Sequence, residues 1–158
     1  MAKGKKITEG LGGSPGIVVA KVRVVDKDWE KMEKLEHGEV MVAERLTPED
    51  TIYMKKAAAF VTDVGGYTAH AVVIGREMGV PVIVGTAEGT KVLKDGEMVV
   101  VDGFTGTTER GLPIGAVYEY VEEVPVLSLT DKMEKLAKER GIPIPPGVLE
   151  KMRKREEM

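Results

Sequence analysis

The 158-residue chain is predicted to fold as an α/β domain, on three observations. "AAFVTDV" (58–64) and "VPVIVG" (80–85) are short apolar runs typical of buried strands. Between them, "TAHAVVIGREMG" (68–79) has the pattern of a helix, with Thr68 as its N-cap and Gly79 as its left-handed stop. A strand, a helix and a strand in this order form a parallel pair with a right-handed crossover. The 42% hydrophobic content supports one core, so a second full domain is not expected.

The segments before this unit also alternate between strand and helix patterns. "IVVAKVRVV" (17–25) is rich in β-branched residues and predicts a strand. "DWEKMEKLEHG" (28–38) predicts a short helix, and "EVMVAERL" (39–46) returns to strand character. "TPED" (47–50) combines a hydroxyl cap, a proline at the first helical position and an acid three residues after the threonine, so another helix is expected to begin there.

The segments after the central unit predict a hairpin and then an appendage. "DGEMVVVDGFTG" (95–106) has two Asp-Gly turn signals around a valine run, which favours a hairpin with a turn at Asp102-Gly103. From Val124 onward the chain is strongly charged and is interrupted by the Pro-rich stretch "GIPIPPG". This composition predicts two charged helices outside the core.

Composition excludes several function classes. The formal charge of −3 comes from 23 basic and 26 acidic residues mixed along the sequence, which argues against a nucleic-acid partner. The absence of cysteine excludes disulfides, thiol catalysis and thiolate metal sites. No apolar run reaches the roughly 18 residues that a membrane span needs, so we expect a cytoplasmic protein without membrane contact. The high Lys and Glu content is typical of thermophiles.

His70 is the candidate functional residue because of its place at the start of a predicted helix. Gly65 and Gly66 follow the strand 58–64 and leave space for a bulky group. With Thr68 as the cap, His70 lies in the first helical turn, where unpaired N–H groups and the helix dipole favour an anion. The same dipole disfavours imidazolium, which leaves a nitrogen lone pair available. The residues predict a phosphoryl acceptor, and the alternative is an ordinary polar histidine at a helix start.

Other site chemistries find less support in the residues. The only other histidine, His37, lies in a predicted turn without ligand spacing to His70, so no metal site is expected. No serine or cysteine nucleophile pattern accompanies His70. A metal-dependent hydrolase stays as a third hypothesis, which predicts divalent metal in the purified chain.

"GGYTAHAVVIGREMGVPVIVG" closely resembles the signature of the phosphohistidine domain of phosphoenolpyruvate-utilising enzymes, within which it is nearest to phosphoenolpyruvate synthase and pyruvate phosphate dikinase. The match assigns the phosphorylated position to His70, and the flanking segments extend it over about residues 10–110. The sequence departs from the family at Gly75, where members carry a small side chain such as alanine. This glycine costs up to about 1 kcal/mol of helix propensity.

The resemblance implies a swivelling domain with a three-layer β/β/α fold, which carries a phosphoryl group on its histidine between two active sites. We expect an N-terminal tail at 1–9, the swivelling domain at 10–124 and a charged helical C-terminal extension at 125–158. A phosphoenolpyruvate-binding barrel alone takes roughly 250 residues. We therefore expect the barrel and the nucleotide-binding domain on separate polypeptides, together with Mg and ATP, and no cofactor on this chain. The alternatives are a piece cut from a larger enzyme and a free-standing carrier in another relay.

The residues around His70 receive supporting roles. Gly65, Gly66, Thr68 and Ala69 are expected to form a phosphate cradle, although the glycines also suit an ordinary tight turn. By resemblance to pyruvate phosphate dikinase, Thr68 matches a regulatory phosphorylation site. Tyr67 packs beside the imidazole or faces solvent, and Arg76, nearly two turns after His70, favours a structural ion pair over phosphate binding. A binding module that keeps the fold without phosphorylation is the alternative function.

Overall fold

The computed structural model describes residues 2–26, 28–121 and 137–141. The chain divides into two compact units, Met1–Val121 and Glu122–Met158. In the second unit the described residues contain a helical segment at 137–140. The rest of the predicted helical extension lies outside the described residues, so that prediction stays untested. The folded domain below is the first unit.

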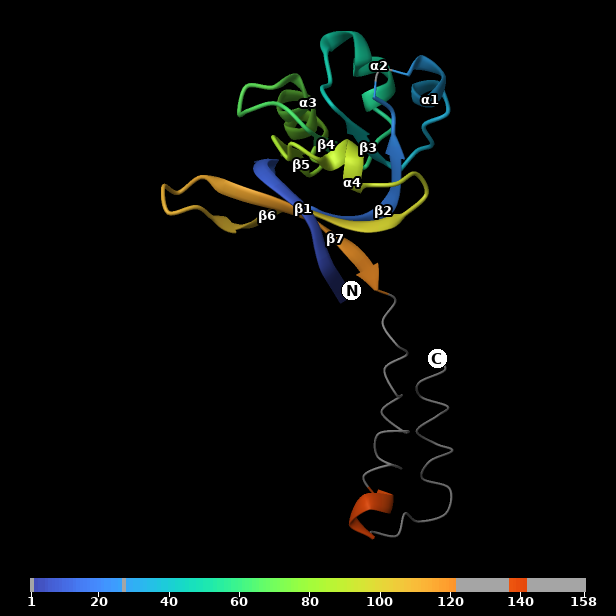
Figure 1. Ribbon diagram of the computed structural model, residues 1–158, viewed down its shortest axis with the longest axis vertical. Coiled ribbons are helices and arrows are strands. Elements are labelled where there is room, and N and C mark those ends of the chain that lie inside the picture. The colour runs from blue at the N-terminus through green and yellow to red at the C-terminus, as the bar shows by residue number, and fades with distance from the viewer. Residues whose placement is uncertain (1, 27, 122–136, 142–158) are drawn as a thin grey trace. The chain divides into compact units, whose positions relative to one another are not determined.

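This unit contains seven strands and five short helices within its described residues, drawn in Figure 1. In chain order they are β1 (Ala2–Ser14), β2 (Ile17–Val24), α1 (Trp29–Glu33), β3 (Val40–Ala43), the 3-10 helix η1 (Pro48–Asp50), α2 (Thr51–Met54), β4 (Ala59–Thr62), α3 (His70–Met78), β5 (Val82–Val84), α4 (Gly89–Val92), β6 (Met98–Thr107) and β7 (Pro113–Val121).

The strands close into a barrel in the order β1-β5-β4-β3-β2-β6-β7. Strands β2, β3, β4 and β5 are parallel to their neighbours within this run, whereas β1, β6 and β7 pair antiparallel. The parallel pair β4 and β5, joined through α3, confirms the strand, helix and strand unit predicted at the centre of the chain. The α/β class is therefore correct. Because the pairing forms one closed sheet, the three-layer arrangement is not confirmed.

Two hydrophobic cores lie on the two faces of the parallel strands. In β3, Met41 and Ala43 belong to one core, together with residues of α1, α2 and α3. Val40 and Val42 belong to the other core, which the strands of the barrel enclose. Side chains alternate across a strand, so a strand covered on both faces is apolar throughout. Figure 1 shows α1, α2 and α3 gathered over one side of the strands. One face of β3 and β4 is therefore packed against the helices.

The predicted N-terminal tail is wrong, because residues 2–9 form the first part of β1. This strand pairs with β7 along most of its length and with β5 at its end. Its sequence, "AKGKKITEGLGGS", is rich in glycine and lysine, which are depleted in strands. Tertiary pairing overrides that weak local preference. The strand β7 was also not predicted, although it supplies β1 with its longest partner.

The hairpin predicted within 95–106 is also wrong. Asp95-Gly96 is a turn that leads into β6, with Gly96 at a φ of +81°. Asp102-Gly103 lies inside β6, next to a shift in its register with β7, and makes no chain reversal. The reversal comes later, where Thr108 N donates to Leu112 O at 2.8 Å. An Asp-Gly pair fits a bulge as well as a turn, and the sequence does not separate the two.

The predicted helix starts are more accurate than the predicted helix lengths. Asp28 caps α1 by accepting from the amides of Glu30 and Lys31, and Thr47 and Asp50 form the predicted capping box. However, α1 ends at Glu33, before the predicted limit of 38. Caps depend on neighbouring residues, whereas helix length also depends on what the helix packs against.

Candidate functional site

His70 is the first residue of α3, as its predicted place in the first helical turn requires. The N-cap, however, is Ala69 and not Thr68, which lies in the preceding turn. Ala69 has an extended backbone with φ −59° and ψ 147°, and no side chain caps the helix. Gly79 ends α3 in the left-handed conformation with φ 73°, as predicted. The first turn of α3 is therefore open to an external acceptor.

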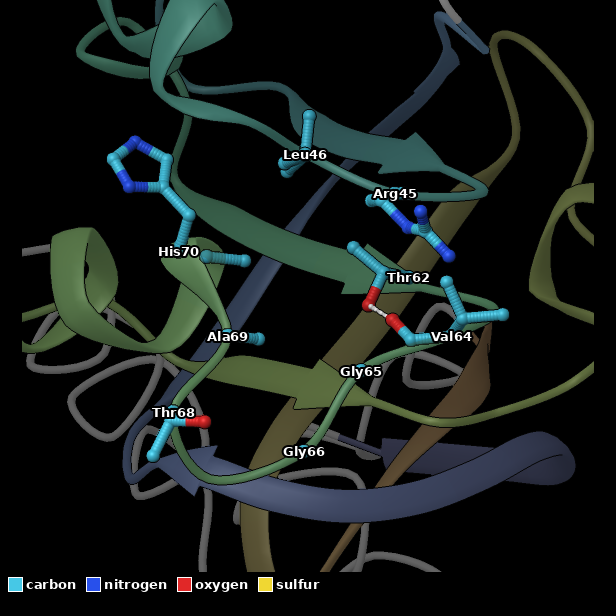
Figure 2. Close-up of a pocket in the computed structure, with 10 residues that line it drawn as sticks. Arg45, Leu46, Thr62, Val64, Gly65, Gly66, Thr68, Ala69 and His70 are labelled. Atoms are coloured by element: carbon cyan, nitrogen blue, oxygen red, sulfur yellow. Dashed lines mark hydrogen bonds between the residues drawn. The ribbon is translucent and has the colours of Figure 1, made fainter.

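A cavity of about 270 Å³ lies beside His70. Its wall is formed by the chain after β3, the end of β4 and the loop into α3, with these residues: Arg45, Leu46, Thr62, Val64, Gly65, Gly66, Thr68, Ala69, His70 and Ala71. A cavity needs only about 10–15 Å³ to hold one water, so this volume leaves room for a phosphoryl group. Figure 2 shows His70 at one side of this cavity and the Arg45 guanidinium at the other.

The imidazole of His70 is held by a residue that the sequence analysis missed. Thr51 Oγ1, in the first position of α2, lies 2.7 Å from His70 Nε2 and donates to Pro48 O at 2.7 Å. The single hydroxyl proton is used on the Pro48 carbonyl, which can only accept. We infer that Nε2 carries a proton and donates it to Thr51, which leaves the lone pair on Nδ1. The capping box at 47–50 fixes where Thr51 falls, but no local pattern links it to His70.

The residues predicted to form a phosphate cradle, Gly65, Gly66, Thr68 and Ala69, lie in the loop before α3, and the amides of this region are not equally free. Gly65 has a φ of +129°, which requires glycine, whereas a side chain at Gly66 would meet no atom within 4 Å. The amide of Ala69 donates to Gly66 O at 3.0 Å and is not available to an anion. The amides of His70 and Ala71, the first two in α3, donate to no backbone carbonyl of the described residues outside helices and strands and receive no side-chain cap. These two amides are the candidate hydrogen-bond donors to a bound anion.

Tyr67 and Arg76 belong to a different region of the surface. The Arg76 guanidinium lies 5.2 Å from the centre of the Tyr67 ring, and its Nε donates to Gly13 O at 2.8 Å. Both residues line a second cavity between the end of β1 and the β6–β7 turn, and neither lines the cavity beside His70. The ion pair predicted for Arg76 is not found, and its partners are instead a carbonyl and an aromatic ring. None of the ion pairs among the described residues involves it.

The residues that the structure describes contain no group of three His, Cys, Asp or Glu side chains that could hold a metal ion. His37 lies exposed in the turn before β3, as predicted, and does not line the cavity beside His70. Among the described helices, none combines the length and the apolar character needed to cross a membrane.

Residues 35–106 match the family model described as "PEP-utilising enzyme, mobile domain". The matched range runs from the end of α1 to β6 and includes the cavity, Thr51 and His70. This part of the chain belongs to the PEP-utilising enzyme mobile domain family. The resemblance drawn from the "GGYTAH" motif is therefore confirmed.

Relatives of this mobile domain are phosphoenolpyruvate synthases. A protein of Archaeoglobus fulgidus described as a probable phosphoenolpyruvate synthase is 49% identical over 110 residues, which make up 70% of this chain and 14% of that protein. The phosphoenolpyruvate synthase of Aeropyrum pernix is 43% identical over 109 residues, 69% of this chain and 13% of that protein. The chain thus spans a small part of the length of these relatives, so their other domains have no counterpart within the matched region.

A solved structure of Enzyme I (nEIt) is 34% identical, covers 68% of this chain and 40% of its own, and superposes with a TM-score of 0.45. The relationship to the mobile-domain family rests on the sequence matches and not on this superposition.

Proposed function

We propose that the chain is the phosphoryl carrier of a phosphoenolpyruvate synthase-like phosphotransferase, with His70 as the residue that accepts and donates the phosphoryl group. The observation that carries this proposal is the position of the imidazole. It lies at the first residue of α3, on the wall of a cavity that also contains the free end of the helix. A nucleophile next to unpaired amides suits transfer of an anionic group.

The transfer needs one nucleophile and an exchange of bonds at phosphorus. A ring nitrogen of His70 uses its lone pair to form an N–P bond, while the bond from phosphorus to the donor oxygen breaks and its electron pair leaves with that oxygen. The reverse displacement returns the electron pair to the nitrogen when an acceptor oxygen attacks. Positioning and charge neutralisation supply most of the catalysis in such transfers.

The donor and the acceptor sites belong to other domains or subunits in this proposal. Phosphoenolpyruvate and pyruvate would bind on one side, and ATP with Mg on the other. The described residues hold no cluster of three metal-ligating side chains, which favours a metal that arrives with the partner. The domain that carries the phosphorylated His70 then moves between the two sites.

The test uses a partner whose own carrier histidine has been removed. The full chain is incubated with a phosphoenolpyruvate synthase homologue that lacks its mobile-domain histidine, first with phosphoenolpyruvate and separately with ATP. Intact-mass analysis should show the gain of one acid-labile phosphate on the wild-type chain. The variant His70→Asn should show none, because asparagine lacks the ring nitrogen.

The matched control is His37→Asn, which removes the other histidine from an exposed turn and should leave the phosphate gain unchanged. If no phosphate appears on the wild-type chain with either donor, the carrier proposal is wrong. A module that binds a partner without being phosphorylated would then be the better description of this domain.

A further inference from the structure

We propose that Arg45 is the cation that binds the phosphoryl group while it resides on His70, an inference that rests on the proposed carrier function. Arg45 lines the same cavity as His70 and, among the described residues, is the only basic side chain other than the imidazole to do so. A guanidinium forms paired, charge-assisted hydrogen bonds with phosphate oxygens. The cavity therefore combines an acceptor nitrogen with a binding group for the transferred oxygens.

The backbone around Arg45 is fixed, while its side chain is not committed. Next to it, Glu44 O accepts from Val64 N at 3.1 Å, and Leu46 is buried in the core beneath the helices. Arg45 itself is exposed and takes part in none of the ion pairs among the described residues. Figure 2 shows its guanidinium across the cavity from the imidazole. A long side chain on a rigid base can swing toward a group that arrives on the ring and release it again.

The other nearby arginine is engaged elsewhere. Arg76 follows His70 on α3, but its Nε donates to Gly13 O at 2.8 Å and its guanidinium stacks over Tyr67. Both contacts lie at the second cavity. Tyr67, three residues before His70, provides no charge. Within the described residues, Arg45 is therefore the arginine that shares the cavity wall with His70.

The acidic residues near the cavity do not neutralise Arg45. None of the described residues that line the cavity carries a carboxylate. Asp63, which follows Thr62 of β4, accepts hydrogen bonds from the Thr90 amide at 2.9 Å and from the Thr90 hydroxyl, so its charge serves the start of α4. A dianion on His70 would thus face one cation and two free amides without a competing anion in the cavity wall.

The experiment uses a small chemical donor, so no partner protein is needed. Potassium phosphoramidate is added to the full chain. The ring nitrogen bonds to phosphorus, the P–N bond of the reagent breaks, and ammonia leaves with that electron pair. After the reagent is removed, intact mass is followed over time at low salt to give the rate of phosphate loss for wild type, Arg45→Gln, Arg45→Lys and Arg110→Gln.

The phosphate should be lost about threefold to tenfold faster from Arg45→Gln than from wild type, as expected when a charge-assisted hydrogen bond is removed. Arg45→Lys should recover part of the lifetime. Arg110→Gln, which removes an exposed arginine from the β6–β7 turn, should match wild type. The difference should shrink in 1 M salt, where the screening length falls to about 3 Å. A general loss of folding in Arg45→Gln would not produce this salt dependence or the lysine rescue.

Two contrary results are distinguishable. If the wild-type chain is phosphorylated on His70 but Arg45→Gln loses phosphate at the rate of Arg110→Gln, the Arg45 inference is wrong and the carrier proposal stands. If His70 takes no phosphate from either phosphoramidate or the partner enzyme, both are wrong.

Discussion

The hydrogen bond between Thr51 and His70 determines how the imidazole is presented. Nε2 lies 2.7 Å from Thr51 Oγ1, and the Thr51 hydroxyl in turn donates to Pro48 O. In this arrangement the free lone pair is on Nδ1. Phosphorylation at Nε2 would require the ring to leave Thr51 and move its proton, whereas phosphorylation at Nδ1 would not. Under the proposed carrier function, the hydrogen bond to Thr51 would favour reaction at Nδ1 over Nε2.

Thr51→Val tests this role at the scale of a single residue. Valine has the same shape as threonine but cannot accept from Nε2, so the Nε2-protonated tautomer loses one hydrogen bond, worth about 0.5–1.5 kcal/mol. We expect the tautomer ratio to shift toward Nδ1–H by about twofold to tenfold. Nitrogen-15 chemical shifts of His70 measure that ratio directly. Unchanged shifts would mean that Thr51 does not hold the tautomer, and Thr90→Val, at a hydroxyl outside the cavity, is the control.

At the scale of elements, α3 is positioned by its close approach to β5. A side chain at Gly75 would overlap Val82 of β5 and lie 3.5 Å from Phe60 of β4. The glycine that departs from the family pattern therefore fits its surroundings, because the missing side chain lets the helix pack directly on the sheet at a cost in helix propensity. This packing fixes the direction of α3 and with it the place of His70 at the mouth of the cavity.

Gly75→Ala should consequently destabilise the protein, although alanine is the better helix former. Overpacking a core costs typically 1–3 kcal/mol, and alanine recovers only about 1 kcal/mol of helix propensity. We expect a net loss of about 1 kcal/mol in the free energy of unfolding, measured by urea denaturation.

Gly106→Ala is the matched control, because a side chain there would meet no atom within 4 Å and the backbone is not left-handed. It should change the unfolding free energy by less than about 0.5 kcal/mol. A Gly75→Ala variant that is more stable than wild type would show that α3 can move away from β5 without cost.

At the scale of the whole folded unit, β1 closes the barrel. It pairs with β7 from Ala2↔Val121 to Leu11↔Ile114 and with β5 from Leu11↔Val84 to Ser14↔Val82. Without it, β5 and β7 would each expose an unpaired edge. The parallel strands that carry the cavity are thus held in place partly by β1, the first strand in the sequence.

Deleting residues 2–9 should therefore destabilise the domain. Several inter-strand hydrogen bonds to β7 would be lost, each worth about 0.5–1.5 kcal/mol net, so we expect a loss of at least about 2 kcal/mol. Thermal unfolding followed by circular dichroism measures the change. An unchanged transition would mean that these residues behave as the tail that the sequence predicted.

The sequence alone determined the features that depend on neighbouring residues: the α/β alternation, the capping box at 47–50, the glycine end of α3 and the place of His70 in its first turn. These signals lie within a few positions of the atoms that they arrange. Only the tertiary structure decided which distant residues share the site. Thr51 is 19 positions from His70, and the strand register and helix packing bring it to the ring.

The same distinction explains Arg45, β1 and Gly75. In the sequence, Arg45 is one charged residue in a loop. It joins the cavity wall only because the parallel strands β3 and β4 place their ends side by side. The glycine- and lysine-rich β1 becomes a strand because β7 and β5 offer it unpaired edges. Gly75 is unfavourable in an isolated helix and necessary against Val82. In each case the deciding contact is between residues far apart in the chain, and local propensity carries no information about it.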